Sequence, residues 1–153
     1  MKNSLESLLE TDHESLALLL AELDTELAKP NIARAFELLD LFWARLAVHI
    51  RAENLHLFPA IANVPASLFT GKGNVPTSEE AHNLLFRLRS DHDFFMKELA
   101  QTIKALREIA DNQQVHAKDI EDVRQRLIVI RKRLEIHNQL EEKRAYLAGT
   151  TFR

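Results

Sequence analysis

The sequence contains no cysteine among its 153 residues. This absence excludes disulfide bonds, zinc ribbons, thiolate-held iron–sulfur clusters and cysteine nucleophiles, so any metal site must use nitrogen and oxygen ligands. Glycine and proline are scarce, with three and four residues. Because these two residue types interrupt helices, their scarcity, together with 46% hydrophobic and 28% charged residues, predicts an all-α protein.

Long apolar runs and a strong excess of one charge are also missing. Without an apolar run of about 18 residues, or an apolar segment after Met1, we expect no transmembrane helix, no signal peptide and a cytoplasmic location. The formal net charge of −3 predicts neither a nucleic-acid nor a membrane partner. The one basic cluster, between Arg124 and Arg133, is interpreted as a solvated helix face.

Four segments have apolar residues at steps of three and four, which is typical of amphipathic helices. A chain of this length is the size of one domain, so we expect a single domain over 1–153. The expected helices are 2–29, 31–58, 77–110 and 117–148. Because two of the connections are short, neighbouring helices must be antiparallel, which predicts an up-down-up-down four-helix bundle.

Ordinary helix-boundary residues occupy the breaks between these segments. Asn31 is a good N-cap for the second helix, and Pro59 is expected to end it. Thr77 and Glu80 form a capping box at the start of the third helix. Residues 59–76 lack periodicity, and they are therefore expected to form one long irregular connection across the end of the bundle.

Potential metal ligands interrupt the apolar seam of every expected helix. Each helix contributes one candidate histidine to its seam, and the second and fourth helices also contribute a glutamate. These candidate ligands are His13, His49, Glu53, His92, His137 and Glu141. Burying an ionised carboxylate without a partner costs several kcal/mol, so two of them in one core require compensation. A bound cation would provide it.

The spacing of these residues predicts a centre for two metal ions. The pattern H-x-x-x-E occurs at His49/Glu53 and at His137/Glu141, and it places both side chains on one helix face about 6 Å apart along the axis. In each hairpin the two histidines are equally far from the turn, so they lie at matching height. Both glutamates step toward the same end of the bundle, where they could bridge two ions.

The two hairpins also repeat each other locally. Asp12-His13 in the first expected helix resembles Asp91-His92 in the third. This pseudo-twofold pattern suits a symmetric dinuclear site. Imidazole and carboxylate ligands suit iron, manganese or zinc, with four histidines and bridging glutamates favouring iron. The aromatic residues of the seams are better explained by packing.

The stretch His49-Ile-Arg-Ala-Glu53-Asn-Leu-His-Leu-Phe-Pro59, with the other histidines and Glu141, resembles the hemerythrin-like HHE cation-binding family over nearly the whole chain. The resemblance implies a non-haem centre of two iron ions, oxo- or hydroxo-bridged. Asn54 departs from the family pattern, in which a second glutamate is common. Leu88 and Met96 flank His92 where oxygen-carrying hemerythrins supply a further histidine. Six protein ligands instead of seven leave room for peroxide, nitric oxide or exchangeable iron.

Three functions stay open at this point. The favoured one is a protein that binds or senses oxygen, nitric oxide or iron, with a small diatomic ligand or peroxide as its partner. The alternatives are a di-iron enzyme acting on peroxide or another oxidant, and a metal-dependent interaction module. No catalytic triad, phosphate loop or nucleic-acid motif is visible, so no catalytic residue is assigned. His56, three residues after Glu53, is interpreted either as a seventh ligand or as a polar residue at the helix end.

Overall fold

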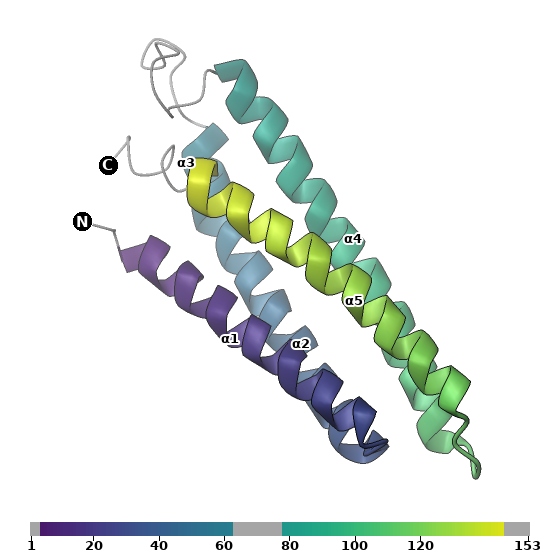
Figure 1. Cartoon of the computed structure of the whole chain (residues 1–153). Helices are drawn as coiled ribbons and strands as arrows, with labels where there is room; N and C mark the ends of the chain where they lie inside the picture. The colour runs from purple at the N-terminus through teal and green to yellow at the C-terminus, as the bar shows by residue number, and fades with distance from the viewer. Residues whose placement is uncertain (1–3, 63–77, 146–153) are drawn as a thin grey trace.

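The computed structural model describes residues 4–62 and 78–145, which form two helical hairpins lying side by side (Figure 1). The first hairpin contains α1 (Ser4–Ala28) and α2 (Ile32–Ala52), and α2 continues through the π-helical segment η1 (Glu53–Leu57) into α3 (Phe58–Ala62). The second contains α4 (Ser78–Asp111) and α5 (Ala117–Leu140), which continues as the π-helical segment η3 (Glu141–Ala145).

The helices pack as an up-down-up-down bundle, as the sequence predicts. Helix α1 packs on α2 and α4 packs on α5, while α2·α4 and α1·α5 contacts join the two hairpins. The turns after α1 and after α4 lie together at one end of the bundle (Figure 1). Within the described ranges, no helix combines the length and apolar character that crossing a bilayer requires.

The predicted cap of the second helix is confirmed. The side chain of Asn31 accepts a hydrogen bond from the backbone N–H of Arg34, with the two atoms 3.4 Å apart. It satisfies one of the backbone donors that the first turn of a helix leaves unpaired. The capping residue expected for the third helix, Thr77, lies outside the described residues, as does the expected end of the fourth helix at residue 148.

The prediction that Pro59 ends the second helix is wrong. The chain stays helical to Ala62, with Pro59 as the second residue of α3. A proline is tolerated in the first turn after a change of helix type, because its missing N–H removes no regular hydrogen bond there. The expected irregular connection therefore starts later than residue 59, and residues 63–77 lie outside the described part of the chain.

Two apolar clusters fill the interior. The larger includes Leu16, Phe42 and the side chains near the interhelical turns, and the smaller surrounds Phe58 near the opposite end. On α1, Leu9 belongs to the smaller cluster and Leu16 to the larger one, and the buried His13 lies between them. The core is thus divided by a polar layer about one or two helical turns thick.

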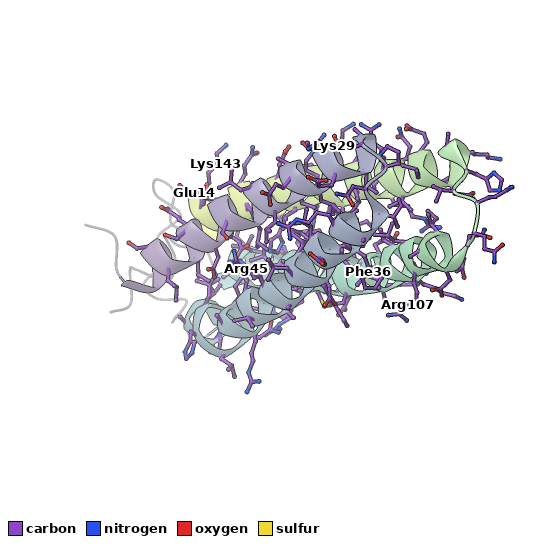
Figure 2. All side chains as sticks on the ribbon, turned by 90° about the horizontal axis from the view of Figure 1, so that it is seen from below. Glu14, Lys29, Phe36, Arg45, Arg107 and Lys143 are labelled. Carbon is purple, nitrogen blue, oxygen red and sulfur yellow. The ribbon has the colours of Figure 1, made fainter. Side chains whose placement is uncertain are left out.

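Charged side chains project from the outer faces of all the long helices (Figure 2). Some of them also cover the seams between helices. The guanidinium of Arg107, on α4, lies 5.8 Å from the ring centre of Phe36, on α2 (Figure 2). Such contacts let an arginine keep its charge in water while its stem and face cover apolar surface.

Candidate metal centre

The structure brings all six sequence-predicted ligands into the polar layer. They form two groups of three buried side chains, and within each group the possible ligand atoms lie within 4.8 Å of one another. Each group combines the two histidines of one hairpin with the glutamate of the other. The groups are His13, His49 and Glu141, and Glu53, His92 and His137.

Each glutamate lies between the two groups. Oε1 of Glu53 is 3.4 Å from Nε2 of His92 and 3.9 Å from Nε2 of His137, yet only 2.9 Å from Nε2 of His49 on its own helix. Oε1 of Glu141 is 2.7 Å from Nε2 of His137. Both carboxylates can therefore reach ions held by either histidine pair, which is the arrangement that bridging requires.

The two carboxylates lie close to imidazole nitrogens but are not aligned for hydrogen bonds with them. Glu53 and Glu141 are fully buried, and none of their four oxygens is aligned for a hydrogen bond with any described residue. Burial by itself would raise the pKa of Glu53, but the neighbouring imidazoles hold it well below its ordinary value of 4.5, so the group is charged. Buried charges without hydrogen bonds are rare unless a cation compensates them. The carboxylates fit a metal site.

The imidazoles of His13 and His49 point their Nε2 atoms at each other, 3.2 Å apart. Their Nδ1 atoms face carboxylates, Glu142 at 3.1 Å and Asp12 at 3.0 Å. Because carboxylates accept hydrogen bonds, they favour the tautomer protonated at Nδ1. Two Nε2 lone pairs then face each other, and this repulsion is relieved when a cation or a shared proton lies between them.

The surroundings shift the pKa values of these two imidazoles in opposite directions. Burial and the nearby His49 lower the pKa of His13. Burial also opposes protonation of His49, but the carboxylates of Glu53 and Asp12 outweigh it and raise the pKa of His49 above 6.5. His13 is thus readily kept neutral, whereas the carboxylates beside His49 favour a positive charge at that position. Both properties are expected at a site that binds a cation.

The repeated Asp-His dipeptide has a structural role that the sequence did not reveal. Oδ2 of Asp12 lies 3.0 Å from Nδ1 of His49, and Oδ2 of Asp91 lies 3.0 Å from Nδ1 of His137. In each hairpin, the aspartate before one histidine therefore holds the ring of the histidine on the neighbouring helix. Carboxylates in this position fix the orientation of a metal-binding imidazole and increase its basicity.

Asp91 is further held by two arginines. Its Oδ1 accepts from Nε of Arg133 at 2.9 Å and from Nε of Arg87 at 3.3 Å. Burial would raise the pKa of Asp91, but the bonds from His137 and Arg133 lower it below its ordinary value. Arg133 belongs to the basic cluster that the sequence assigns to a solvated face. For this residue that interpretation is wrong, because α5 turns it toward α4.

Both π-helical segments begin at a candidate glutamate, η1 at Glu53 and η3 at Glu141. A π turn contains one more residue than an α turn, and such turns occur frequently at functional sites. After Glu53 the buried seam continues to Leu57 and Ile61, while His56 is exposed and lies outside both ligand groups. Because the π turn is wider, a seam drawn with α-helical spacing wrongly places His56 on the inward face of the helix.

Comparisons with known proteins agree with this geometry. The family model described as Hemerythrin HHE cation binding domain matches residues 4–147. No curated protein and no solved structure matches the chain significantly. The matched range contains all six candidate ligands, and the resemblance inferred from the sequence is confirmed.

Proposed function

Because this chain belongs to the hemerythrin HHE cation-binding family, we propose that it is a non-haem di-iron protein that binds or senses oxygen or nitric oxide at its His/Glu centre. One observation supports this most directly. Two groups of buried His and Glu side chains, each of three residues, lie side by side, and their carboxylates have no hydrogen-bond partner among the described residues.

The residues divide naturally between two ions. His13 and His49 would hold one ion, His92 and His137 the other, and Glu53 and Glu141 would bridge them. Imidazole with carboxylate suits iron better than calcium or magnesium, and the absence of cysteine removes the thiolate ligands of many zinc and copper sites. When bound, two irons supply a redox-active centre that takes up small ligands.

The rest of the chain supplies orientation and exclusion of water. Asp12 and Asp91 hold two of the imidazole rings through Nδ1. The apolar clusters above and below the polar layer separate it from both ends of the bundle. In such a buried layer, charges interact more strongly than in water, which strengthens the binding of an ion by its ligands.

The proposal is tested on full-length protein purified from iron-supplemented cells. Iron is counted per chain, and absorption spectra are recorded without oxygen, then with oxygen, nitric oxide and peroxide. We expect about two irons per chain, as two ligand groups require, and a spectrum that changes reversibly with oxygen or nitric oxide. The matched controls are Glu141→Gln and the exposed Glu14→Gln, of which only the first should lose iron.

The same measurements separate the alternatives. Sustained consumption of peroxide, lost in Glu141→Gln, would make the protein an oxidant-handling enzyme. Iron that binds without any response to these three ligands would favour iron storage or a metal-dependent interaction module. A folded protein that takes up no metal would refute the di-iron proposal.

A further inference from the structure

One of the four candidate histidine ligands lacks the support that the others have. Nδ1 of His13, His49 and His137 each lies 3.0 to 3.1 Å from a carboxylate oxygen. Nδ1 of His92 has no hydrogen-bond partner among the described residues, although the side chain is only about 5% exposed. Its Nε2 faces the polar layer, 3.4 Å from Oε1 of Glu53.

The pseudo-twofold arrangement shows which partner is missing. Glu142 follows the candidate ligand Glu141 and contacts Nδ1 of His13, the histidine of the opposite hairpin. The equivalent residue after Glu53 is Asn54, and the equivalent histidine is His92. Asparagine is shorter than glutamate by one methylene and has no charge, and no hydrogen bond joins Asn54 to His92.

A solvent-open cleft occupies the corresponding place. It has a volume of about 340 Å³ and is lined by Asn54, Phe58, Arg89, His92 and Asp93. Within its lining, the ring of Phe58 is stacked on the imidazole of His92, with ring centres 5.1 Å apart and planes at 17°. His92 is therefore part of the wall of this cleft, beside the Phe58 ring, while its Nδ1 atom is itself buried.

The cleft is equipped for an anion. Arg89 lies one helical turn before His92 on α4, and its guanidinium carbon is 5.8 Å from the ring centre of Phe58. Within the described residues Arg89 forms no ion pair. The exposed carboxylate of Asp93 also lines the cleft and opposes an anion, but it forms no ion pair there. The Arg89 guanidinium, the Asn54 amide and Nδ1 of His92 provide three groups of donors.

We propose that this cleft binds a small carboxylate or similar oxyanion, which accepts a hydrogen bond from Nδ1 of His92 and pairs with Arg89. The bound anion provides a hydrogen-bond acceptor for Nδ1 of His92, as Glu142 does for Nδ1 of His13. The inference rests on the proposed function in one respect, because a metal on Nε2 keeps the proton of His92 on Nδ1. It adds an outer anion site whose occupancy is coupled to the ion bound by His92 and His137.

The test uses formate and full-length protein loaded with zinc, which is diamagnetic, and labelled with ¹⁵N at histidine. Formate replaces chloride at constant ionic strength while the imidazole N–H resonances are followed by NMR. We expect a saturable shift of the His92 Nδ1–H resonance, with the resonances of His13, His49 and His137 unchanged. Formate binding directly to the metal would instead shift several of them, and that result would overturn the proposal.

Four variants locate the binding. Arg89→Gln should weaken formate binding about tenfold, the usual cost of losing a charge-assisted bond. Arg107→Gln is the matched control, since Arg107 is also an exposed arginine of α4 placed 5.8 Å from a phenylalanine ring. Asn54→Glu should abolish the response by providing an internal acceptor, whereas Asn54→Gln, of equal length but uncharged, should keep it.

The outcomes separate this inference from the proposed function. Zinc and iron contents are measured on the same samples. Normal metal content without a saturable formate shift, or a shift that Arg89→Gln and Asn54→Glu leave unchanged, refutes the anion site alone. A protein that binds no metal refutes the di-iron proposal. The formate titration of the metal-free protein then tests the anion site by itself, and formate binding that does not depend on Arg89 would count against that site.

Discussion

Oδ2 of Asp91 lies 3.0 Å from Nδ1 of His137, and the carboxylate is completely buried. Asp12 stands in the same relation to His49, but its side chain is 36% exposed and no arginine forms an ion pair with it within the described residues. The two halves of the candidate centre are therefore alike in connectivity and different in environment. The half supported by Asp91 depends more on its aspartate, because solvent cannot replace a buried hydrogen bond.

Replacing these aspartates by asparagine should weaken metal binding unequally. Asp91→Asn should reduce metal affinity about 10- to 100-fold, the usual effect of losing a carboxylate behind a metal-bound histidine. Asp12→Asn should have a smaller effect because water can reach that position. The affinities are measured by competition with a chelator, and the exposed Asp40→Asn serves as the control. Equal losses in the two variants would contradict this account.

Removing either bridging carboxylate should affect both ions. Because Glu53 approaches histidines of both hairpins, Glu53→Gln should lower the metal content of the whole centre instead of halving it. Bound metal stabilises only the folded state, by about 2.7 kcal/mol for each site at a hundredfold excess over its dissociation constant. The thermal midpoint of the metal-loaded protein should therefore fall by roughly 10 °C or more. A variant that keeps one full equivalent of tightly bound metal would show independent sites.

The sequence was sufficient to predict the helical bundle and to identify the polar side chains that meet in its centre. Helical periodicity and the N-cap residue Asn31 define the first hairpin, and equal distances from the turn bring His13 and His49 together. These are local and arithmetical properties of helices, so they can be read without coordinates.

The surroundings of the centre could not be read in the same way. The roles of Glu142 and Arg133 depend on contacts between helices distant in sequence, which periodicity does not specify. The π turn after Glu53 depends on a small balance among backbone hydrogen bonds and core packing, and it changes the seam at Leu57 and His56. The repeated Asp-His dipeptide was the one available signal, and its meaning became clear only through the pairing in space.

The exposure of His56 gives a prediction about ligand number. His56→Ala should leave the metal content and the absorption spectrum unchanged, because its side chain is exposed and belongs to neither ligand group. His49→Ala, one helical turn on the other side of Glu53, should lose metal. Metal analysis of both variants, prepared in parallel, decides the matter. Loss of metal in His56→Ala would mean that the second helix rearranges when ions bind.

The metal-free and metal-loaded proteins should respond to pH in opposite directions. In the metal-free protein, carboxylates raise the pKa values of His49 and His137 above 6.5 despite burial. Their contribution to stability is fully present below pH 6.5 and is lost as the pH rises through the raised values. The lowered pKa of His13 opposes this effect but involves one group against two. The lowered pKa of Glu53 contributes stability above pH 4.5 that is lost only in stronger acid.

The unfolding free energy of metal-free protein should therefore be greatest between pH 4.5 and pH 6.5 and should decrease as the pH rises above 6.5. Metal ions compete with protons for the same imidazoles, so the stability added by metal increases with pH over this range. Denaturant unfolding with and without chelator, followed by circular dichroism at several pH values, measures both curves. Curves that rise and fall together would show that the buried histidines are not the groups that couple protons to the metal.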